Sequence, residues 1–233
     1  MEPIYQLLTE RAPVLKSKID SNTNQSRVVV ILAGPPGSGK STIAEHVVER
    51  LNGTCATPLA AIVPMDGFHL PRSTLDRMPN SREAYARRGA SWTFHADGIA
   101  DLVQTLSKSR FRSPEKMDTI LASSFDHAVK DPVENGIVIG PHIQFVLLEG
   151  NYLLLDEEPW RGIRELVDES WFVDVEPGLA RSRIAKRHVK AGIEQTMEAA
   201  YRRAEVNDLL NGMEIRRKLL KPDILVTSVE EAS

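Results

Sequence analysis

A glycine-rich segment directly after a short apolar run constrains this chain more than any other feature of its sequence. Val28–Ala33 is a continuous run of β-branched and other apolar residues, typical of a strand buried on both faces of a parallel sheet. Residues 34–41 then read G-P-P-G-S-G-K-S, and residues 40–51 carry apolar side chains at helical spacing. This order of strand, turn and helix predicts that backbone N–H groups converge in the turn and form a cradle for an anion.

The segment matches the complete phosphate-binding P-loop pattern, G-x-x-x-x-G-K-S. Lys40 is expected to reach the β- and γ-phosphates of a nucleoside triphosphate, and the Ser41 hydroxyl is expected to coordinate Mg²⁺. The partial positive charge at the start of the following helix adds to the attraction. We therefore predict ATP and Mg²⁺ as cofactors. The predicted nucleotide-binding residues are Gly34, Pro35, Pro36, Gly37, Ser38, Gly39, Lys40, Ser41 and Thr42.

Further apolar runs alternate with helical patterns along the rest of the chain, and this alternation predicts a parallel sheet with right-handed crossovers. We predict an α/β fold, the three-layer P-loop NTPase fold with a five-stranded parallel sheet. The other expected strands are residues 59–65, 143–148, 169–175 and 224–227, and the other expected helices are residues 1–25, 81–88, 96–107, 160–167 and 178–220, the last broken near Gly192. We predict one α/β domain over residues 1–233, with an N-terminal helix and linker (1–26), insertions over residues 67–140 (irregular or a hairpin over 110–140) and a lid region over residues 178–200 that could close over the bound phosphates.

The composition narrows the class of protein. The chain has 233 residues, of which 42% are hydrophobic, and no apolar run approaches the roughly 18 residues of a membrane-spanning helix. Its 29 basic and 32 acidic residues give no electrostatic case for sequence-independent nucleic-acid binding. Cys55 is the single cysteine, which excludes an internal disulfide. We expect a small-molecule partner, a monomer or homodimer, and a cytosolic location, with entry into the nucleus left open.

Two of the expected strands run into carboxylates. Asp66 follows residues 59–65, and Glu149 follows residues 143–148. Because the carboxyl ends of parallel strands face the ligand crevice, both carboxylates are expected near the phosphates. A carboxylate at Asp66 can accept a proton from an attacking hydroxyl, although an aspartate at a strand end is as often a helix or turn cap. Glu149 suits Mg²⁺, directly or through water.

The motifs G-P-P-G-S-G-K-S-T, M-D-G-F-H and L-L-E-G-N-Y together resemble the phosphoribulokinase, uridine kinase and pantothenate kinase family of P-loop small-molecule kinases. The resemblance covers residues 28–226 and is closest to a uridine kinase-like or sugar kinase-like branch. It implies an enzyme that transfers the γ-phosphoryl group of ATP to a hydroxyl of a nucleoside, a sugar or a pantothenate-like metabolite. It also implies that Asp66 is the general base, and that Ser41 and Glu149 serve the metal.

The acceptor pocket is predicted from less specific signals. The resemblance places Phe125-Asp126-His127 at the acceptor, with Phe125 where the family usually has tyrosine. The arginine candidates could hold an anionic acceptor or form an ion pair with Glu83, and the aromatic candidates could stack on a ring or pack in the core. The candidate acceptor-binding residues are His69, Arg87, Arg88, Trp92, Phe94, Asp126, His127 and Tyr152.

A basic stretch near residues 181–190 is the candidate lid. Arg183 and Arg187 are four residues apart and share a helix face, so they could pair with charge on the transferred phosphoryl group. A solvated basic face is the alternative for such a charge run. The resemblance favours the lid, which makes Arg183 and Arg187 candidate catalytic residues beside Lys40 and Asp66.

Two other functions fit parts of the pattern. A nucleotide monophosphate kinase would use Arg87 and Arg88 for an acceptor phosphate, but it would have no use for a base at Asp66. A non-catalytic nucleotide-dependent switch would also carry a phosphate-binding loop, yet the chain has no N-K-x-D guanine-reading motif. A kinase with a hydroxyl acceptor accounts for more of the motifs than either.

Overall fold

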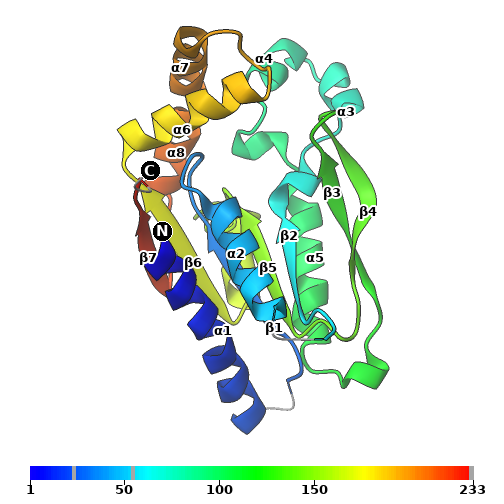
Figure 1. Cartoon of the computed structure of the whole chain (residues 1–233). Helices are drawn as coiled ribbons and strands as arrows, with labels where there is room; N and C mark the ends of the chain where they lie inside the picture. The colour runs from blue at the N-terminus through cyan, green and yellow to red at the C-terminus, as the bar shows by residue number, and fades with distance from the viewer. Residues whose placement is uncertain (23–24, 54–55, 231–233) are drawn as a thin grey trace.

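The five predicted strands form one sheet in the computed structural model, which describes residues 1–22, 25–53 and 56–230 (Figure 1). Cys55 lies outside these ranges. All neighbouring strands are parallel, in the order β2-β5-β1-β6-β7, so the predicted five-stranded parallel sheet is confirmed. The strands are β1 (Val28–Ala33), β2 (Ala60–Pro64), β5 (Phe145–Gly150), β6 (Glu169–Val175) and β7 (Ile224–Ser228).

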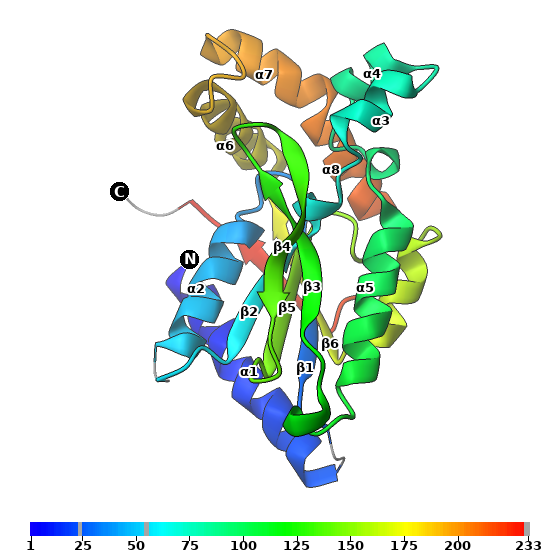
Figure 2. The same cartoon turned by 90° about the vertical axis from the view of Figure 1, so that its right-hand side faces the viewer.

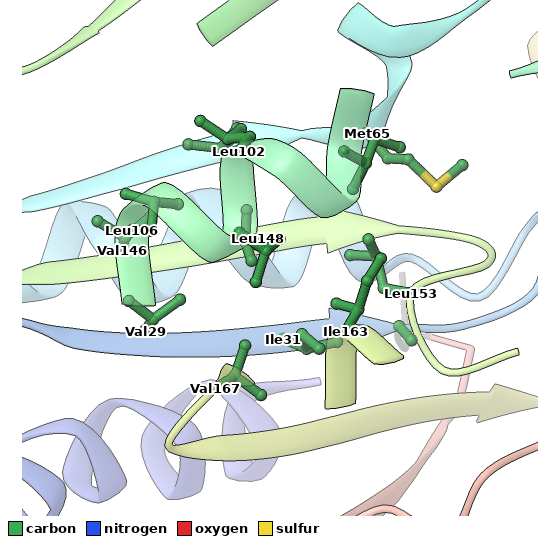
Figure 3. Packing of buried hydrophobic residues seen from close by; sticks show 14 of the residues in the cluster. Val29, Ile31, Met65, Leu102, Leu106, Val146, Leu148, Leu153, Ile163 and Val167 are labelled. Carbon is green, nitrogen blue, oxygen red and sulfur yellow. The ribbon is translucent and has the colours of Figure 1, made fainter. Parts of the chain in front are cut away.

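Helices cover both faces of this sheet, which gives three layers. On β1, alternate residues Val28, Val30 and Leu32 pack with α1 (Glu2–Asn22) and α2 (Lys40–Asn52). The intervening Val29 and Ile31 pack on the opposite side with α5 (Ala96–Ser109) and the 3₁₀ helix η4 (Trp160–Leu166), as Figure 3 shows. All six residues of β1 are buried, which explains the continuous apolar run. Of the described helices, none is both long and apolar enough to cross a membrane.

The insertion between β2 and β5 contains an antiparallel hairpin, so of the two expectations for residues 110–140 the hairpin is right. Its strands are β3 (Ile120–Asp126) and β4 (Asp131–Ile139), and we call these two strands and their turn the acceptor hairpin. Short helices precede it: η1 (Met65–Phe68), α3 (Arg72–Arg77), α4 (Ser81–Ala86) and η2 (Ser91–Thr93), and η3 (Pro114–Lys116) follows α5. The helix α3 was not expected, because six residues are too few to show a periodicity.

The basic helical stretch before β7 is divided in two places. It forms α6 (Pro177–Lys190), α7 (Met197–Val206) and α8 (Asp208–Arg217). The predicted break lies at Gly192, whose φ is +66°, and a second, unpredicted break lies at Asn207. Residues 160–167 were predicted as an α-helix and instead form the 3₁₀ helix η4, a shorter and tighter turn. In both views α3, α4, α6, α7 and the turn of the acceptor hairpin lie at one end of the molecule (Figures 1 and 2).

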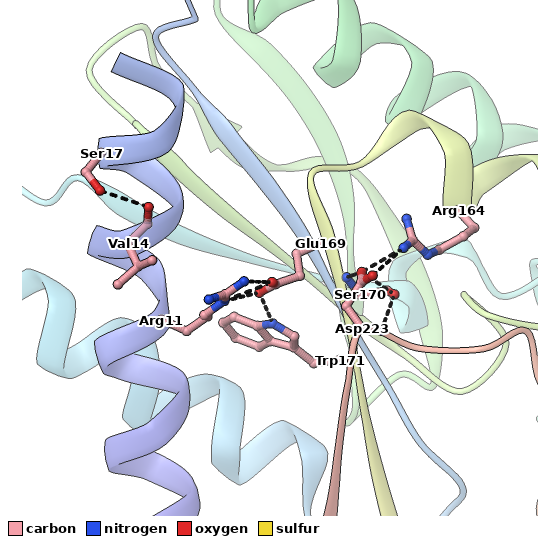
Figure 4. A network of polar contacts seen from close by, with 8 residues as sticks. All are labelled: Arg11, Val14, Ser17, Arg164, Glu169, Ser170, Trp171 and Asp223. Atoms are coloured by element: carbon pink, nitrogen blue, oxygen red, sulfur yellow. Dashed lines mark hydrogen bonds and ion pairs between the residues drawn. The ribbon is translucent and has the colours of Figure 1, made fainter. Parts of the chain in front are cut away.

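Two polar networks attach the flanking segments to β6 (Figure 4). The Arg11 guanidinium of α1 donates to the buried carboxylate of Glu169 at 2.8 Å, and the Trp171 indole N–H donates to the same carboxylate at 2.7 Å. Asp223 accepts from the Ser170 backbone N–H at 2.8 Å and from Arg164 at 2.7 Å. The N-terminal helix and the segment entering β7 are therefore held on the sheet by charge-assisted hydrogen bonds.

Arg27, immediately before β1, is completely buried without a carboxylate partner among the described residues. Its guanidinium donates to the carbonyls of Ile143 and Gly140, at 2.9 and 2.8 Å, and to the Ser109 hydroxyl at 2.9 Å. Burial lowers the pKa of Arg27 from its ordinary value. This fork of donors ties the start of β1 to the end of α5 and to the segment entering β5, opposite the phosphate loop.

Replacing Arg27 by methionine should lower the free energy of unfolding by about 3 kcal/mol, because two buried carbonyls and a buried hydroxyl lose their donors. Chemical denaturation of both proteins measures the difference. Arg112→Met is the matched control, since the Arg112 side chain is 55% exposed and pairs with Asp118 at the surface. An Arg27→Met protein as stable as the control would contradict the structural role.

Candidate active site

The phosphate loop, residues 34–41, has the backbone geometry of an anion cradle. Gly37 and Gly39 have φ values of +80° and +82°, conformations that turn successive N–H groups inward and that side-chain-bearing residues rarely adopt. Gly39 is the N-cap of α2, and no side chain caps that helix. The N-terminal N–H groups of α2 therefore face the loop without a competing side-chain acceptor, which favours binding of a phosphate.

Lys40 and Glu149 form a largely buried pair beside the loop. The Lys40 ammonium lies 3.6 Å from a Glu149 carboxylate oxygen, and the two side chains are only 11% and 10% exposed. Burial raises the pKa of Glu149, the Asp66 charge raises it further, and the neighbouring Lys40 and Ser41 oppose the rise. The site thus holds a carboxylate whose negative charge is incompletely compensated.

The donor set at this position fits Mg²⁺. Glu149 offers a carboxylate, and Ser41 offers an exposed hydroxyl at the start of α2. Within the described ranges, no group of three or more His, Cys, Asp or Glu side chains could hold a metal alone. Magnesium commonly binds through one or two protein oxygens together with substrate phosphates, and these two residues suit that mode.

Asp66 lies at the same edge of the sheet as Glu149. Strands β2 and β5 are neighbours, and Pro64 is paired in register with Glu149. Asp66 follows two residues later on η1, with its side chain 48% exposed. The register therefore gathers both carboxylates at the carboxyl ends of adjacent parallel strands, where a ligand is expected.

The two motifs that carry these carboxylates are packed against each other through glycines. A Cβ atom on Gly150 would lie 2.4 Å from the Cβ of Met65, and one on Gly67 would lie 2.0 Å from the Ser123 carbonyl oxygen. Both distances are impossible for real side chains. The glycines in E-G-N-Y and D-G-F-H thus let η1 sit directly between β5 and the acceptor hairpin.

His69 joins Asp66 to the aromatic side of the site. Its Nδ1 lies 2.9 Å from the Asp66 carbonyl oxygen, which can only accept, so this nitrogen carries the proton and Nε2 is left as an acceptor. Burial lowers the pKa of His69, which keeps the imidazole neutral near pH 7. The ring centroid lies 4.1 Å from that of Phe94 and 5.0 Å from that of Phe125 on the acceptor hairpin.

The other acceptor candidates divide between this cluster and the core. His127 is exposed, with its ring 5.2 Å from the Phe125 ring, and Trp92 is 41% exposed. Asp126 instead accepts from the backbone N–H groups of Ala128 and Val129, so it stabilises the hairpin turn.

Tyr152 requires a correction. Its side chain is completely buried, and its hydroxyl donates to the Gly89 carbonyl at 2.8 Å. Burial raises the pKa of the phenol. The ring packs with Phe94 and Trp160, so Tyr152 supports the wall of the site from behind and does not line an open pocket.

Arg87 is also placed differently from the prediction. Its guanidinium donates to the carbonyl of Val206 at 2.9 Å and to the Asn211 side chain at 2.8 Å, so it is bound neither by Glu83 nor by an open acceptor site. Arg88 donates to the Lys130 carbonyl at 2.7 Å and pairs with Asp131 at 3.3 Å, with its guanidinium carbon 5.8 Å from the Phe125 ring. Both arginines are held by protein groups, and only Arg88 borders the aromatic cluster.

The two lid arginines have different partners. Arg183 lies against the phosphate loop, where it donates to the Gly37 carbonyl at 3.3 Å and to the Ser228 hydroxyl at 2.7 Å. Arg187 is 61% exposed and lies 3.7 Å from Asp208 on α8. Although their spacing predicts a common helix face, Arg183 contacts the phosphate loop and Arg187 contacts α8. A catalytic role for either arginine stays a prediction.

Sequence reasoning missed three asparagines near the site. The Asn151 side-chain oxygen, directly after Gly150, is buried and has no hydrogen-bond partner among the described residues. The other two asparagines lie at the start of α8 and bind the segment that contains Arg87 and Arg88. The Asn207 side-chain amide donates to the Arg88 carbonyl, and the Asn211 side-chain oxygen accepts from the Arg87 guanidinium. For Asn151 the signal was available, since it follows a strand-terminal carboxylate, whereas nothing local marks the other two.

No family model matches the chain, but comparisons with known proteins find several kinases that are similar to it. It is 39% identical over 203 residues to the Schizosaccharomyces pombe protein named "Putative uridine kinase C227.14", spanning 87% of this chain and 84% of that protein. It is 32% identical over 240 residues to "ATP-dependent kinase YFH7" of Lachancea thermotolerans, spanning 91% of this chain and 68% of that protein. A crystal structure of a "putative fructose transport system kinase" from Silicibacter sp. TM1040 matches with a TM-score of 0.77 and 29% identity, over 94% of this chain and 98% of that one.

The parallel sheet and the phosphate loop, together with these kinase relatives, identify the chain as a P-loop kinase, an enzyme that transfers a phosphoryl group from ATP. The chain belongs to the family of P-loop small-molecule kinases that contains these uridine kinase-like and YFH7 proteins. The resemblance inferred from the three sequence motifs is thereby confirmed. Membership of a kinase family favours an enzyme over the alternative of a non-catalytic nucleotide-dependent switch.

Substituting Gly150 by alanine should destabilise the protein by about 1–3 kcal/mol, because the added methyl group overlaps Met65 and separates η1 from β5. Thermal unfolding measures the loss, and nucleotide-dependent stabilisation of the same variant reports on the neighbouring phosphate loop. Gly162→Ala is the matched control, since no atom lies within 4 Å of a Cβ at that position. Equal melting temperatures for the two variants would contradict the packing argument.

Proposed function

We propose that this kinase phosphorylates a hydroxyl group of a small polar metabolite, with Asp66 as the general base. The observation that supports the proposal is the convergence of Asp66, Glu149 and Lys40 at the carboxyl edge of β2 and β5, beside the phosphate loop. A half-exposed carboxylate next to a phosphate site is suited to receive the proton of an attacking hydroxyl.

The reaction starts with ATP held by the loop backbone, Lys40 and the start of α2. Lys40 donates to the β- and γ-phosphates, and its positive charge compensates the negative charge that develops during transfer. Ser41 and Glu149 would hold Mg²⁺, which when bound neutralises phosphate charge. Asp66 orients the acceptor hydroxyl and takes its proton, while the neutral His69 ring, bonded to the Asp66 carbonyl, fixes the position of η1.

The acceptor is expected beside Asp66, over the ring cluster of His69 and Phe125 near the turn of the acceptor hairpin. Phe125, His127 and His69 supply ring faces there, the His69 imidazole is neutral, and Arg88 supplies a positive charge that is already paired with Asp131. Such a wall suits an uncharged polyol, sugar or nucleoside better than an acceptor phosphate. A nucleotide monophosphate acceptor finds no free arginine pair, because Arg87 and Arg88 are both bound by protein groups.

A panel of acceptors identifies the substrate class. Purified enzyme with MgATP is assayed for ADP release against uridine, cytidine, fructose, glycerate, pantothenate and nucleoside monophosphates. Uridine and fructose are included because similar proteins are named as a uridine kinase and a fructose transport system kinase. We expect turnover with at least one of the alcohols, and faster turnover with uridine, cytidine or fructose than with the anionic glycerate and pantothenate. Turnover confined to the nucleoside monophosphates would overturn the hydroxyl-acceptor proposal.

Asp66→Asn should reduce phosphoryl transfer by about 10²–10⁴-fold and leave nucleotide affinity near the wild-type value, because only the proton acceptor is lost. Steady-state kinetics with the acceptor found above and titration with a non-hydrolysable ATP analogue measure the two effects separately. Asp76→Asn, on α3, is a control in which a carboxylate away from the edge of the sheet is neutralised. Wild-type turnover by the Asp66→Asn protein would remove Asp66 from the mechanism.

A further inference from the structure

The adjacent residues Arg87 and Arg88 bind different elements of the structure. Arg87 is the C-cap of α4, and its guanidinium donates to the Val206 and Asn207 carbonyls, at 2.9 and 3.4 Å, and to the Asn211 side-chain oxygen at 2.8 Å. All three acceptors are uncharged and lie at the junction of α7 and α8. The planar fork of arginine can span such an arrangement, whereas the single ammonium of lysine cannot.

The next residue, Arg88, is bound to the acceptor hairpin. It donates to the Lys130 carbonyl at 2.7 Å and pairs with Asp131, the first residue of β4. Its own carbonyl accepts from the Asn207 side-chain amide at 3.3 Å. The Arg87-Arg88 pair thus links the hairpin turn on one side with the start of α8 on the other.

Helix α8 is in turn fixed against the phosphate loop. A Cβ atom on Gly212 would lie 3.3 Å from the Pro35 Cβ, so the helix backbone runs directly beside the loop. Arg216, one turn further, donates to Asp174 at 2.8 Å and to the Val175 carbonyl at 2.7 Å, at the end of β6. Neighbouring residues of one helix, Asn211 and Gly212, therefore face the acceptor side and the phosphate side.

We propose that Arg87 and Asn211 are positioning residues that couple the acceptor hairpin to the phosphate loop, so that nucleotide bound at the loop orders the hairpin. The inference rests on the proposed function only in requiring nucleotide at residues 34–41. Coupling through contiguous contacts needs a rigid element that both sites bear upon, and α8 is that element here. Binding ATP first then lowers the entropic cost of ordering the acceptor wall, which favours productive binding of the acceptor.

Amide hydrogen exchange tests the coupling without knowledge of the acceptor. Exchange is followed in residues 34–52 and in residues 120–139, with and without Mg²⁺ and the non-hydrolysable ATP analogue AMP-PNP. In the wild type, we expect AMP-PNP to slow exchange in both segments, in the hairpin by about five- to tenfold. In Arg87→Met and Asn211→Ala, the phosphate loop should remain protected by AMP-PNP, and the nucleotide-dependent slowing in the hairpin should be lost.

Arg82→Met is the matched control, because Arg82 lies on the same helix α4 and is exposed. Circular dichroism confirms that each variant folds. Because the two variants lie on different elements, the test can still be made with one of them if the other does not fold. Hairpin protection that persists in both Arg87→Met and Asn211→Ala overturns the proposal, as does wild-type protection confined to residues 34–52. Absence of protection at residues 34–52 in the wild type overturns nucleotide binding itself, and with it both proposals.

Discussion

The rest of the site depends on a buried carboxylate placed opposite the phosphate-binding lysine. Glu149 is the penultimate residue of β5, between β2 and the central strand β1, and its burial makes the negative charge costly unless a cation compensates it. Lys40 supplies part of that compensation at 3.6 Å. A second positive charge in the same place is favourable on electrostatic grounds, which supports the proposal that Mg²⁺ binds here together with the nucleotide.

The parallel register then determines what surrounds this pair. Because β2 is hydrogen-bonded beside β5, the chain leaving β2 passes directly in front of Glu149, and Asp66 is carried there on η1. Glycines at positions 67 and 150 remove the side chains that would keep η1 away.

Much of the fold and of the phosphate site could be predicted from the sequence, because local patterns encode them. The continuous apolar run of β1, the glycine-rich loop and the strand-terminal carboxylates each combine composition with position, and all are found where the pattern places them. The acceptor side could not be predicted in the same way. Tyr152 binds the carbonyl of Gly89, which lies 63 positions away in the sequence, and Arg87 binds the carbonyl of Val206, which lies more than 100 positions away. Local spacing in the sequence cannot predict such contacts, so it cannot tell whether these side chains contact a ligand or the protein.

The break between α7 and α8 shows the same limit in another form. The chain changes direction at Asn207, a single residue that ends one helix and starts the next, while helical propensity continues on both sides. Only the tertiary hydrogen bonds from Arg87 and to the Arg88 carbonyl identify this position as a junction. Propensity determines that these residues are helical, and long-range contacts determine where the helix is divided.

The close approach of Gly67 to the Ser123 carbonyl has a consequence for how such an enzyme can diversify. This contact fixes the middle of β3 against η1, and hence against Asp66, while the hairpin turn at residues 127–130 is exposed and lies several residues beyond it. Changes in the turn can therefore reshape the surface near the proposed acceptor site without moving Asp66, the proposed general base. The hairpin combines a tightly packed base with an exposed tip, so the surface near the site can change while the packing beside Asp66 is kept.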